Sequence, residues 1–172
     1  MLTILRHVLS ILVLPFTVVV LLPWWLLSRF PAPGPLWPVA TPLFRVAWPL
    51  AAACLLLGLG LFAWTVSLFA RVGQGTLAPW DPTRKLVAVG PYRYVRNPMI
   101  SGVALLLIGQ ALLWGSWAVG LWACLFISIN HVYFILSEEP GLEKRFGETY
   151  RVYKAHVPRW LPRLRPWEGD EK

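Results

Sequence analysis

The chain has 172 residues, of which 57% are hydrophobic and only 14% are charged. This composition excludes an ordinary water-soluble domain, which must cover its surface with polar side chains, and it predicts an integral membrane protein. The formal net charge of +8 predicts anionic lipid head groups as partners and no nucleic acid, because a basic fringe beside apolar segments more often contacts lipid.

Four membrane-spanning helices are predicted, because four stretches without charge approach the length of about 20 apolar residues that a crossing needs. They cover about residues 8–27, 47–70, 99–114 and 117–137. The third is short, so we expect it to be tilted or buried against its neighbours. Gly115 and Ser116, between two tryptophans, predict a tight turn at the membrane surface before the fourth.

The first apolar stretch admits a second interpretation as a signal peptide. Pro15 and Pro23 lie inside it, it is long for a signal core, and no convincing cleavage site follows. We therefore favour a retained first span.

The basic residues predict how the spans are oriented. Four crossings place both termini on one side, and of the 16 lysines and arginines only Arg29 and Arg45 then fall on the other. Lysine and arginine concentrate in cytoplasmic loops, so both termini and the loop of residues 71–98 are predicted to be cytoplasmic. In a bacterium this membrane would be the inner, or plasma, membrane.

The predicted fold class is all-α, with residues 1–172 forming a single membrane domain. After the last span, apolar residues recur every three or four positions and predict one amphipathic cytoplasmic helix that lies on the bilayer. These residues are Leu142, Phe146, Tyr150, Tyr153 and Val157, and the helix ends at Pro158. Cys54 and Cys124 fall within spans and have no metal-type spacing, so neither a disulfide nor a metal site is predicted.

The candidate chemistry gathers at the cytoplasmic ends of the last two spans. His131 precedes Glu138 by seven residues, almost two helical turns, so both project from nearly the same face. Arg96 immediately precedes the third span, which Pro98 begins. Each of these residues also has a plainer explanation. His131 would be a packing residue, Glu138 a solvated acid and Arg96 an anchor on the cytoplasmic side. Together they predict an anionic or zwitterionic cofactor, and the residues alone permit either S-adenosylmethionine or a nicotinamide dinucleotide.

Three ordered elements carry a family resemblance. They are "GQGTLAPWDPTRKLVAVGPYRYVRNPMISG", a hairpin of about 35 residues, and "SEEPGLEKRFGETYRVYKAHVPRWLP". Over about residues 60–163 the chain resembles the integral-membrane isoprenylcysteine carboxyl methyltransferase and phospholipid N-methyltransferase superfamily. The resemblance implies that S-adenosylmethionine is enclosed by residues of about 71–163. It also implies an acceptor that enters from the lipid, either a prenylcysteine carboxylate or a phospholipid amine.

The resemblance also assigns candidate residues. Gly73 and Gly75 match a glycine pair ascribed to cofactor binding in phospholipid methyltransferases, and Glu138 and Glu139 match the paired glutamates of the same enzymes. Arg96, Asn97 and Pro98 match an Arg-His-Pro or Arg-Asn-Pro element, and asparagine in place of histidine leans toward lipid or other small amphipathic acceptors.

We assign roles to these residues as hypotheses. The glutamates would hold ribose or ammonium groups, and Arg96 or Arg159 would hold the cofactor carboxylate. The aromatic wall would come from Tyr92, Tyr150 or Tyr153. The candidate catalytic residues are His131, Asn97 and Arg96, and His131 or a glutamate would act as general base if the acceptor is an ammonium.

Two other functions compete with methyl transfer. Sterol-type reductases that use NADPH have a related C-terminal scaffold, but the paired glutamates would repel the extra phosphate of NADPH. A non-catalytic membrane adaptor would explain the spans, but not the concentration of special residues on one face.

Overall fold

The computed structural model describes residues 12–32, 34, 42–68, 71–72 and 86–169, and every regular element within them is helical. The predicted all-α class is therefore confirmed for the described part of the chain. The elements are η1 (Leu12–Leu21), α2 (Leu22–Arg29), α3 (Pro42–Leu68), η3 (Gly90–Arg93), α4 (Pro98–Trp114), α5 (Trp117–Tyr133), η4 (Phe134–Glu138), α6 (Glu139–Phe146) and α7 (Glu148–His156).

Two helices in the described part are long and apolar enough to cross a membrane. They are Val46–Leu68 and the continuous run Trp117–Phe146, whereas Pro15–Arg29 and Pro98–Trp114 are shorter apolar helices. In each of the two long helices only 22% of the most apolar window is buried inside the protein. Such extensive exposed apolar surface fits a lipid environment rather than water. The topology of four crossings stays a prediction.

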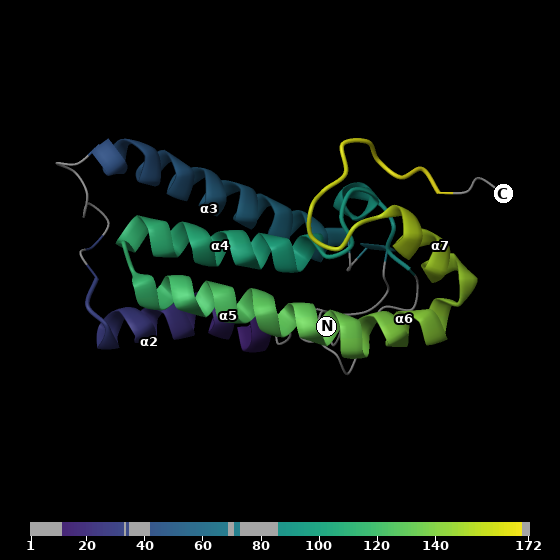
Figure 1. Cartoon of the computed structure of the whole chain (residues 1–172), viewed down its shortest axis with the longest axis horizontal. Helices are drawn as coiled ribbons and strands as arrows, with labels where there is room; N and C mark the ends of the chain where they lie inside the picture. Colours follow the sequence, from purple (N-terminus) through teal and green to yellow (C-terminus); the bar gives the residue numbers. More distant parts are fainter. Residues whose placement is uncertain (1–11, 33, 35–41, 69–70, 73–85, 170–172) are drawn as a thin grey trace.

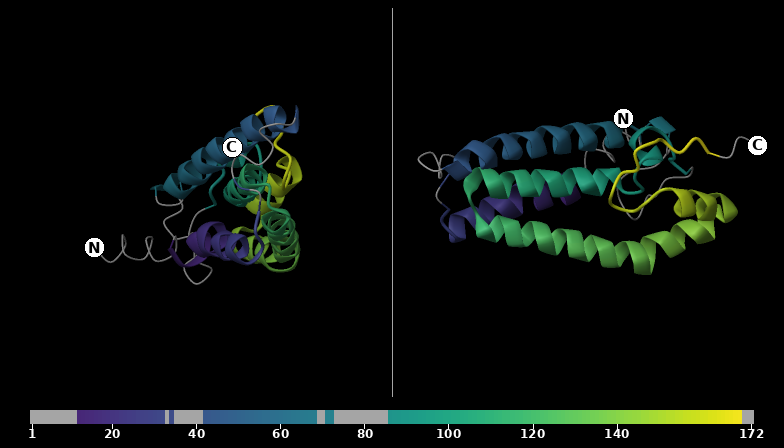
Figure 2. Two further views of the ribbon diagram at one scale, coloured as in Figure 1. Left: turned by 90° about the vertical axis from the view of Figure 1, so that its left-hand side faces the viewer. Right: turned by 45° about the horizontal axis from the view of Figure 1, so that its top comes forward.

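Three of the helices run side by side along the long axis of the molecule (Figure 1). Helix α4 lies between α3 and α5, as the end-on view in Figure 2 shows, and α2 packs against α5. Between α4 and α5 is a buried cluster of Val103, Leu107, Ala123 and Phe126. The short third helix is thus buried against its neighbours, as expected.

Close contact between α3 and α4 depends on glycine. A Cβ atom placed on Gly102 would lie 3.0 Å from the carbonyl oxygen of Gly58 and 3.1 Å from the amide nitrogen of Phe62. Small residues at such crossings let two helix backbones approach, which replaces the hydrophobic driving force that is missing in lipid. This contact brings the backbones of α3 and α4 close together at Gly58 and Gly102.

The predicted turn between the last two apolar helices is confirmed. Gly115 ends α4 in the left-handed conformation with φ of 63°, which glycine adopts without a steric penalty. Ser116 is the N-cap of α5, and its hydroxyl oxygen accepts a hydrogen bond from the amide of Val119. Two capped helix ends therefore meet in a two-residue connection.

The single amphipathic helix expected over residues 142–157 is two helices. Helix α6 ends at Gly147, whose φ of 57° and ψ of −129° belong to a region that favours glycine, and α7 starts at the next residue. The expected apolar face does gather in one cluster, but Leu86, Ala88 and Trp167 of the same chain pack against it. In this part of the chain, the protein itself covers the face that we expected to lie on the bilayer.

Candidate functional site

The start of α4, the end of α5 and the two C-terminal helices meet at one end of the helix bundle (Figure 1). Residues 157–169, here called the C-terminal segment, return across this end and bind the chain just before α4. The bonds run from Arg96 N to Pro158 O (2.9 Å), from Arg163 N to Tyr94 O (3.0 Å), from Trp167 N to Arg93 O (2.9 Å) and from Arg93 Nε to Trp167 O (2.6 Å). This pairing brings residues about 60 to 75 positions apart into one site.

Glu139 is the centre of the site. It is 5% exposed, and three cations surround its carboxylate. Arg159 Nε donates to Oε1 at 2.7 Å, Arg96 Nη1 lies 3.0 Å from the same oxygen, and Lys154 Nζ lies 3.2 Å from Oε2. We call Arg96, Lys154 and Arg159 the cationic cluster. Both oxygens of Glu139 are therefore engaged within the protein, and Glu139 joins α6, α7, the start of α4 and the C-terminal segment.

Two donor atoms of Arg96 have no acceptor in the described part of the chain, although a hydrogen bond between its side chain and Tyr150 contributes to the pKa of that phenol. The Nε and Nη1 atoms of Arg96 are buried and make no hydrogen bond, so the contact with Glu139 is an ion pair without hydrogen-bond geometry. Its side chain is 11% exposed. A buried donor without an acceptor is costly, because it has lost water and gained nothing in return. A carboxylate of a bound ligand could accept hydrogen bonds from these two atoms of Arg96.

Glu138 differs from its neighbour. It is partly exposed, and among the described residues no hydrogen bond or ion pair engages its carboxylate. Its charge acts on the phenols of Tyr92 and Tyr150, which places it beside the aromatic residues of the site. Of the two predicted glutamates, Glu138 is the one that has a carboxylate to offer a ligand.

The three predicted tyrosines are buried and lie together. The hydroxyl of Tyr153 donates to the carbonyl oxygen of Tyr92 at 2.7 Å, which ties α7 to η3. Burial raises the pKa of Tyr92 well above its usual value, with added effects of Tyr153 and Glu138. Burial also raises the pKa values of Tyr153 and Tyr150, and Arg96 opposes both shifts. All three phenols therefore stay neutral at physiological pH.

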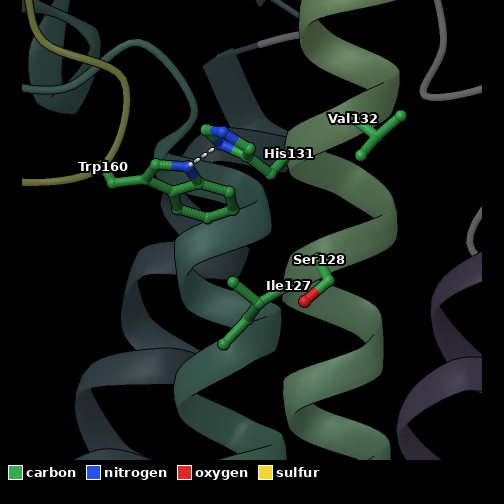
Figure 3. Close-up of a pocket in the computed structure, with 5 residues that line it drawn as sticks. All are labelled: Ile127, Ser128, His131, Val132 and Trp160. Carbon is green, nitrogen blue, oxygen red and sulfur yellow. Dashed lines mark hydrogen bonds between the residues drawn. The ribbon is translucent and has the colours of Figure 1, made fainter.

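His131 and Trp160 form a second part of the site. The indole Nε1 of Trp160 donates to His131 Nδ1 at 3.0 Å, and the two rings stack with a 28° angle between their planes. They line a pocket of about 550 Å³ together with Ile127, Ser128 and Val132. Figure 3 shows His131 and Ile127 on the side of α5 that faces Trp160, with Val132 on another side of the helix.

Comparison with known proteins supplies the family. A model described as phospholipid methyltransferase matches residues 48–149, more than half of the chain. The chain belongs to the phospholipid methyltransferase family. This membership and the two apolar helices long enough to cross a bilayer indicate a membrane protein of the methyltransferase type.

Two curated relatives are similar to parts of the chain. The phosphatidylethanolamine N-methyltransferase of Zygosaccharomyces rouxii is 30% identical over 102 residues, which are 55% of this chain and 11% of that protein. An uncharacterized protein of Haemophilus influenzae is 36% identical over 63 residues, which are 37% of this chain and all of that protein. The chain thus spans about a tenth of the length of the yeast relative. No solved structure matches it significantly.

The remaining predicted residues lie at the start of α4 or outside the described residues. Pro98 is buried in the first turn of α4, and Asn97 is the N-cap, although its side chain makes no cap hydrogen bond. The Asn97 carbonyl accepts from both the amide and the hydroxyl of Ser101, each at 3.0 Å. Gly73 and Gly75 lie outside the described residues, so their predicted role in the family site stays a prediction.

Sequence reasoning missed two residues of this site. Lys154 was not among the predicted site residues, yet it contacts Glu139 and donates to Glu143 at 2.8 Å. The hydrogen bond with Glu143 raises the pKa of Lys154, against burial, and Glu139 adds to the rise. Lys154 lies one helical turn after the predicted site residue Tyr150, and this spacing indicates that both side chains lie on the same side of the helix. Trp160 follows α7 in an irregular segment, where no periodicity marks it.

Proposed function

We propose that this chain is an integral-membrane methyltransferase that uses S-adenosylmethionine and acts on an amphipathic acceptor embedded in lipid. Membership in the phospholipid methyltransferase family supports methyl transfer over a reductase or an adaptor. The proposed site faces the cytoplasm together with both termini, which rests on the distribution of lysine and arginine. The observation that carries the proposal concerns two groups that both act on the Tyr150 phenol: the buried Arg96, with two unused donor atoms, and the Glu138 carboxylate, which has no partner among the described residues.

These two groups fit the two charged ends of a zwitterionic amino-acid moiety. The Nε and Nη1 donors of Arg96 would bind the carboxylate, a charge-assisted pairing that is about twice as strong as a neutral one. Glu138 would accept from the ammonium or from ribose hydroxyls. The buried, neutral rings of Tyr92 and Tyr150 would form an aromatic wall that a cation can approach.

Glu139 has a different role in this proposal from the ligand role that the paired glutamates first implied. Its carboxylate is occupied by the cationic cluster, so it positions Arg96 rather than touching a ligand. Such supporting contacts hold a binding side chain in the orientation that the ligand needs.

When bound, S-adenosylmethionine supplies an electrophilic methyl group attached to a positively charged sulfur. The chain's own residues align the acceptor with that methyl group and exclude water, and such alignment accounts for much of the rate enhancement in reactions of this kind. We propose a lipid amine as the acceptor, because a named relative is a phosphatidylethanolamine N-methyltransferase. A prenylcysteine carboxylate would be the alternative within the same membrane-embedded class.

Calorimetric titration of the detergent-solubilised chain tests the proposal. We expect S-adenosylhomocysteine to bind and NADPH not to bind. Loss of a hydrogen bond to a charged group is expected to weaken binding about 10-fold or more in Glu138→Gln. The matched control is Glu148→Gln, at an exposed glutamate that forms an ion pair with Arg151. Binding of NADPH alone would support the reductase instead, and binding of neither ligand by a folded protein would support the adaptor.

A further inference from the structure

The pocket beside His131 is lined by α5 and by Trp160, which is the chain neighbour of Arg159 in the cationic cluster. Its lining residue Val132 is 52% exposed, and Ile129 in α5 and Leu136 in the following η4 are 53% and 73% exposed. A molecule in this pocket would therefore contact an apolar surface that is open to lipid and also lie near the charged site. His131 precedes Glu138 by seven residues, and the last five of them form the π-helix η4 (Phe134–Glu138), so the α-helical spacing that predicted a shared face does not apply between them.

The hydrogen bond from Trp160 determines the tautomer of His131. An indole nitrogen can only donate, so the Nδ1 atom that accepts from it at 3.0 Å must carry no proton. The proton of the neutral imidazole is then on Nε2, and we assign it there from the hydrogen-bond network. With Nδ1 occupied and Nε2 already protonated, His131 donates hydrogen bonds and has no free nitrogen with which to take a proton.

The other polar hydrogens of the pocket are already used. The indole hydrogen of Trp160 is bonded to His131, and the hydroxyl of Ser128 donates to the carbonyl oxygen of Cys124 at 2.9 Å. Among the side chains that line the pocket, the Nε2 hydrogen of His131 is left as the donor for a ligand. An apolar pocket with one such donor selects an oxygen acceptor attached to a hydrocarbon body.

We propose that this pocket binds a phospholipid, with His131 Nε2 donating to a phosphodiester oxygen and the acyl chains lying on the exposed apolar surface of α5. Arg159, the chain neighbour of Trp160, is paired with Glu139, so the preference for a phosphodiester rests on the His131 donor, whose hydrogen bond to a charged oxygen is stronger than one to a neutral oxygen. His131 is then a positioning residue and not the general base of the sequence-based hypothesis. As far as this lipid is the methyl acceptor, the inference rests on the proposed function.

Nitrogen NMR of the full chain, labelled with ¹⁵N-histidine in detergent micelles, tests the tautomer directly. The chain has 3 histidines, and the His131 signals are identified by their loss in His131→Gln. We expect an unprotonated Nδ1 and a protonated Nε2, and a shift toward a mixture of tautomers in Trp160→Phe. A protonated Nδ1 in the unmodified protein would overturn the inference, whatever reaction the protein catalyses.

Titration with a short-chain phosphatidylethanolamine tests the ligand, with the diacylglycerol of equal chain length as the probe that lacks the phosphate. We expect the phospholipid to bind at least about tenfold more tightly, as for a hydrogen bond to a charged acceptor. His131→Gln, which keeps an N–H donor, should retain most of this preference, and His131→Phe should lose it. His156→Gln, at the exposed histidine of α7, is the control and should behave like the unmodified protein.

The outcomes separate this inference from the proposed function. Equal binding of the two lipids, or a preference that survives in His131→Phe, would overturn the phospholipid site. Absence of S-adenosylhomocysteine binding with the lipid preference intact would instead remove the methyltransferase proposal. If methyl transfer is measured, loss of kcat in His131→Gln with unchanged lipid affinity would make His131 the base and refute its role as a donor.

Discussion

Replacing Glu139 with glutamine removes the negative charge from the centre of the cationic cluster. The Glu139 side chain is 7% exposed, and the side chains of its three partners are 11%, 21% and 37% exposed for Arg96, Arg159 and Lys154. Removing one partner of a buried ion pair costs about 3–5 kcal/mol, because the remaining charge stays buried without compensation. We apply this value to the two arginines and no more than about 1 kcal/mol to the more exposed Lys154 contact.

The expected loss is therefore about 3–5 kcal/mol of unfolding free energy, mainly from the arginines. At about 2–4 °C per kcal/mol for a chain of this size, the midpoint of thermal unfolding should fall by about 6–20 °C. Tryptophan fluorescence during heating in one fixed detergent measures it. Glu148→Gln, an exposed glutamate with a side chain 75% exposed, should change the midpoint by about 2 °C or less. A Glu139→Gln midpoint within that range would refute the role of Glu139 as the residue that holds the site together.

Two further perturbations test other parts of the fold. Gly102→Val should separate α3 from α4, because its Cβ would lie 3.0 Å from the Gly58 carbonyl oxygen, and we expect a cost of about 1–3 kcal/mol or more. The same substitution at Gly60, where a Cβ would meet no atom within 4 Å, is the control, and equal melting of the two variants would contradict the close contact. Stability should also fall above about pH 10, the usual pKa of tyrosine, because burial raises the pKa values of Tyr92 and Tyr153. Below that pH both states are protonated, whereas above it the unfolded chain loses protons first, so Tyr153→Phe should flatten the alkaline decline in melting temperature.

The sequence alone determined that the long uncharged stretches form helices and where the turn between the last two apolar helices lies. Long uncharged stretches can form only helices or closed barrels in lipid, and the Gly115–Ser116 turn is local because each residue caps its own helix. The order of the arginine, proline and glutamate motifs identified the methyltransferase superfamily, and the family match over residues 48–149 confirms the phospholipid methyltransferase assignment.

The tertiary structure decided which of these residues meet and what each can do. Glu138 and Glu139 are neighbours with the same side chain, yet one is occupied by three cations and the other has no partner among the described residues. That difference arises because the C-terminal segment returns to pair with residues 93–96 and brings Arg159 and Trp160 with it. An irregular segment has no periodicity from which its path can be predicted. Charge pairing and histidine tautomer depend on partners distant in sequence, so only the folded chain determines them.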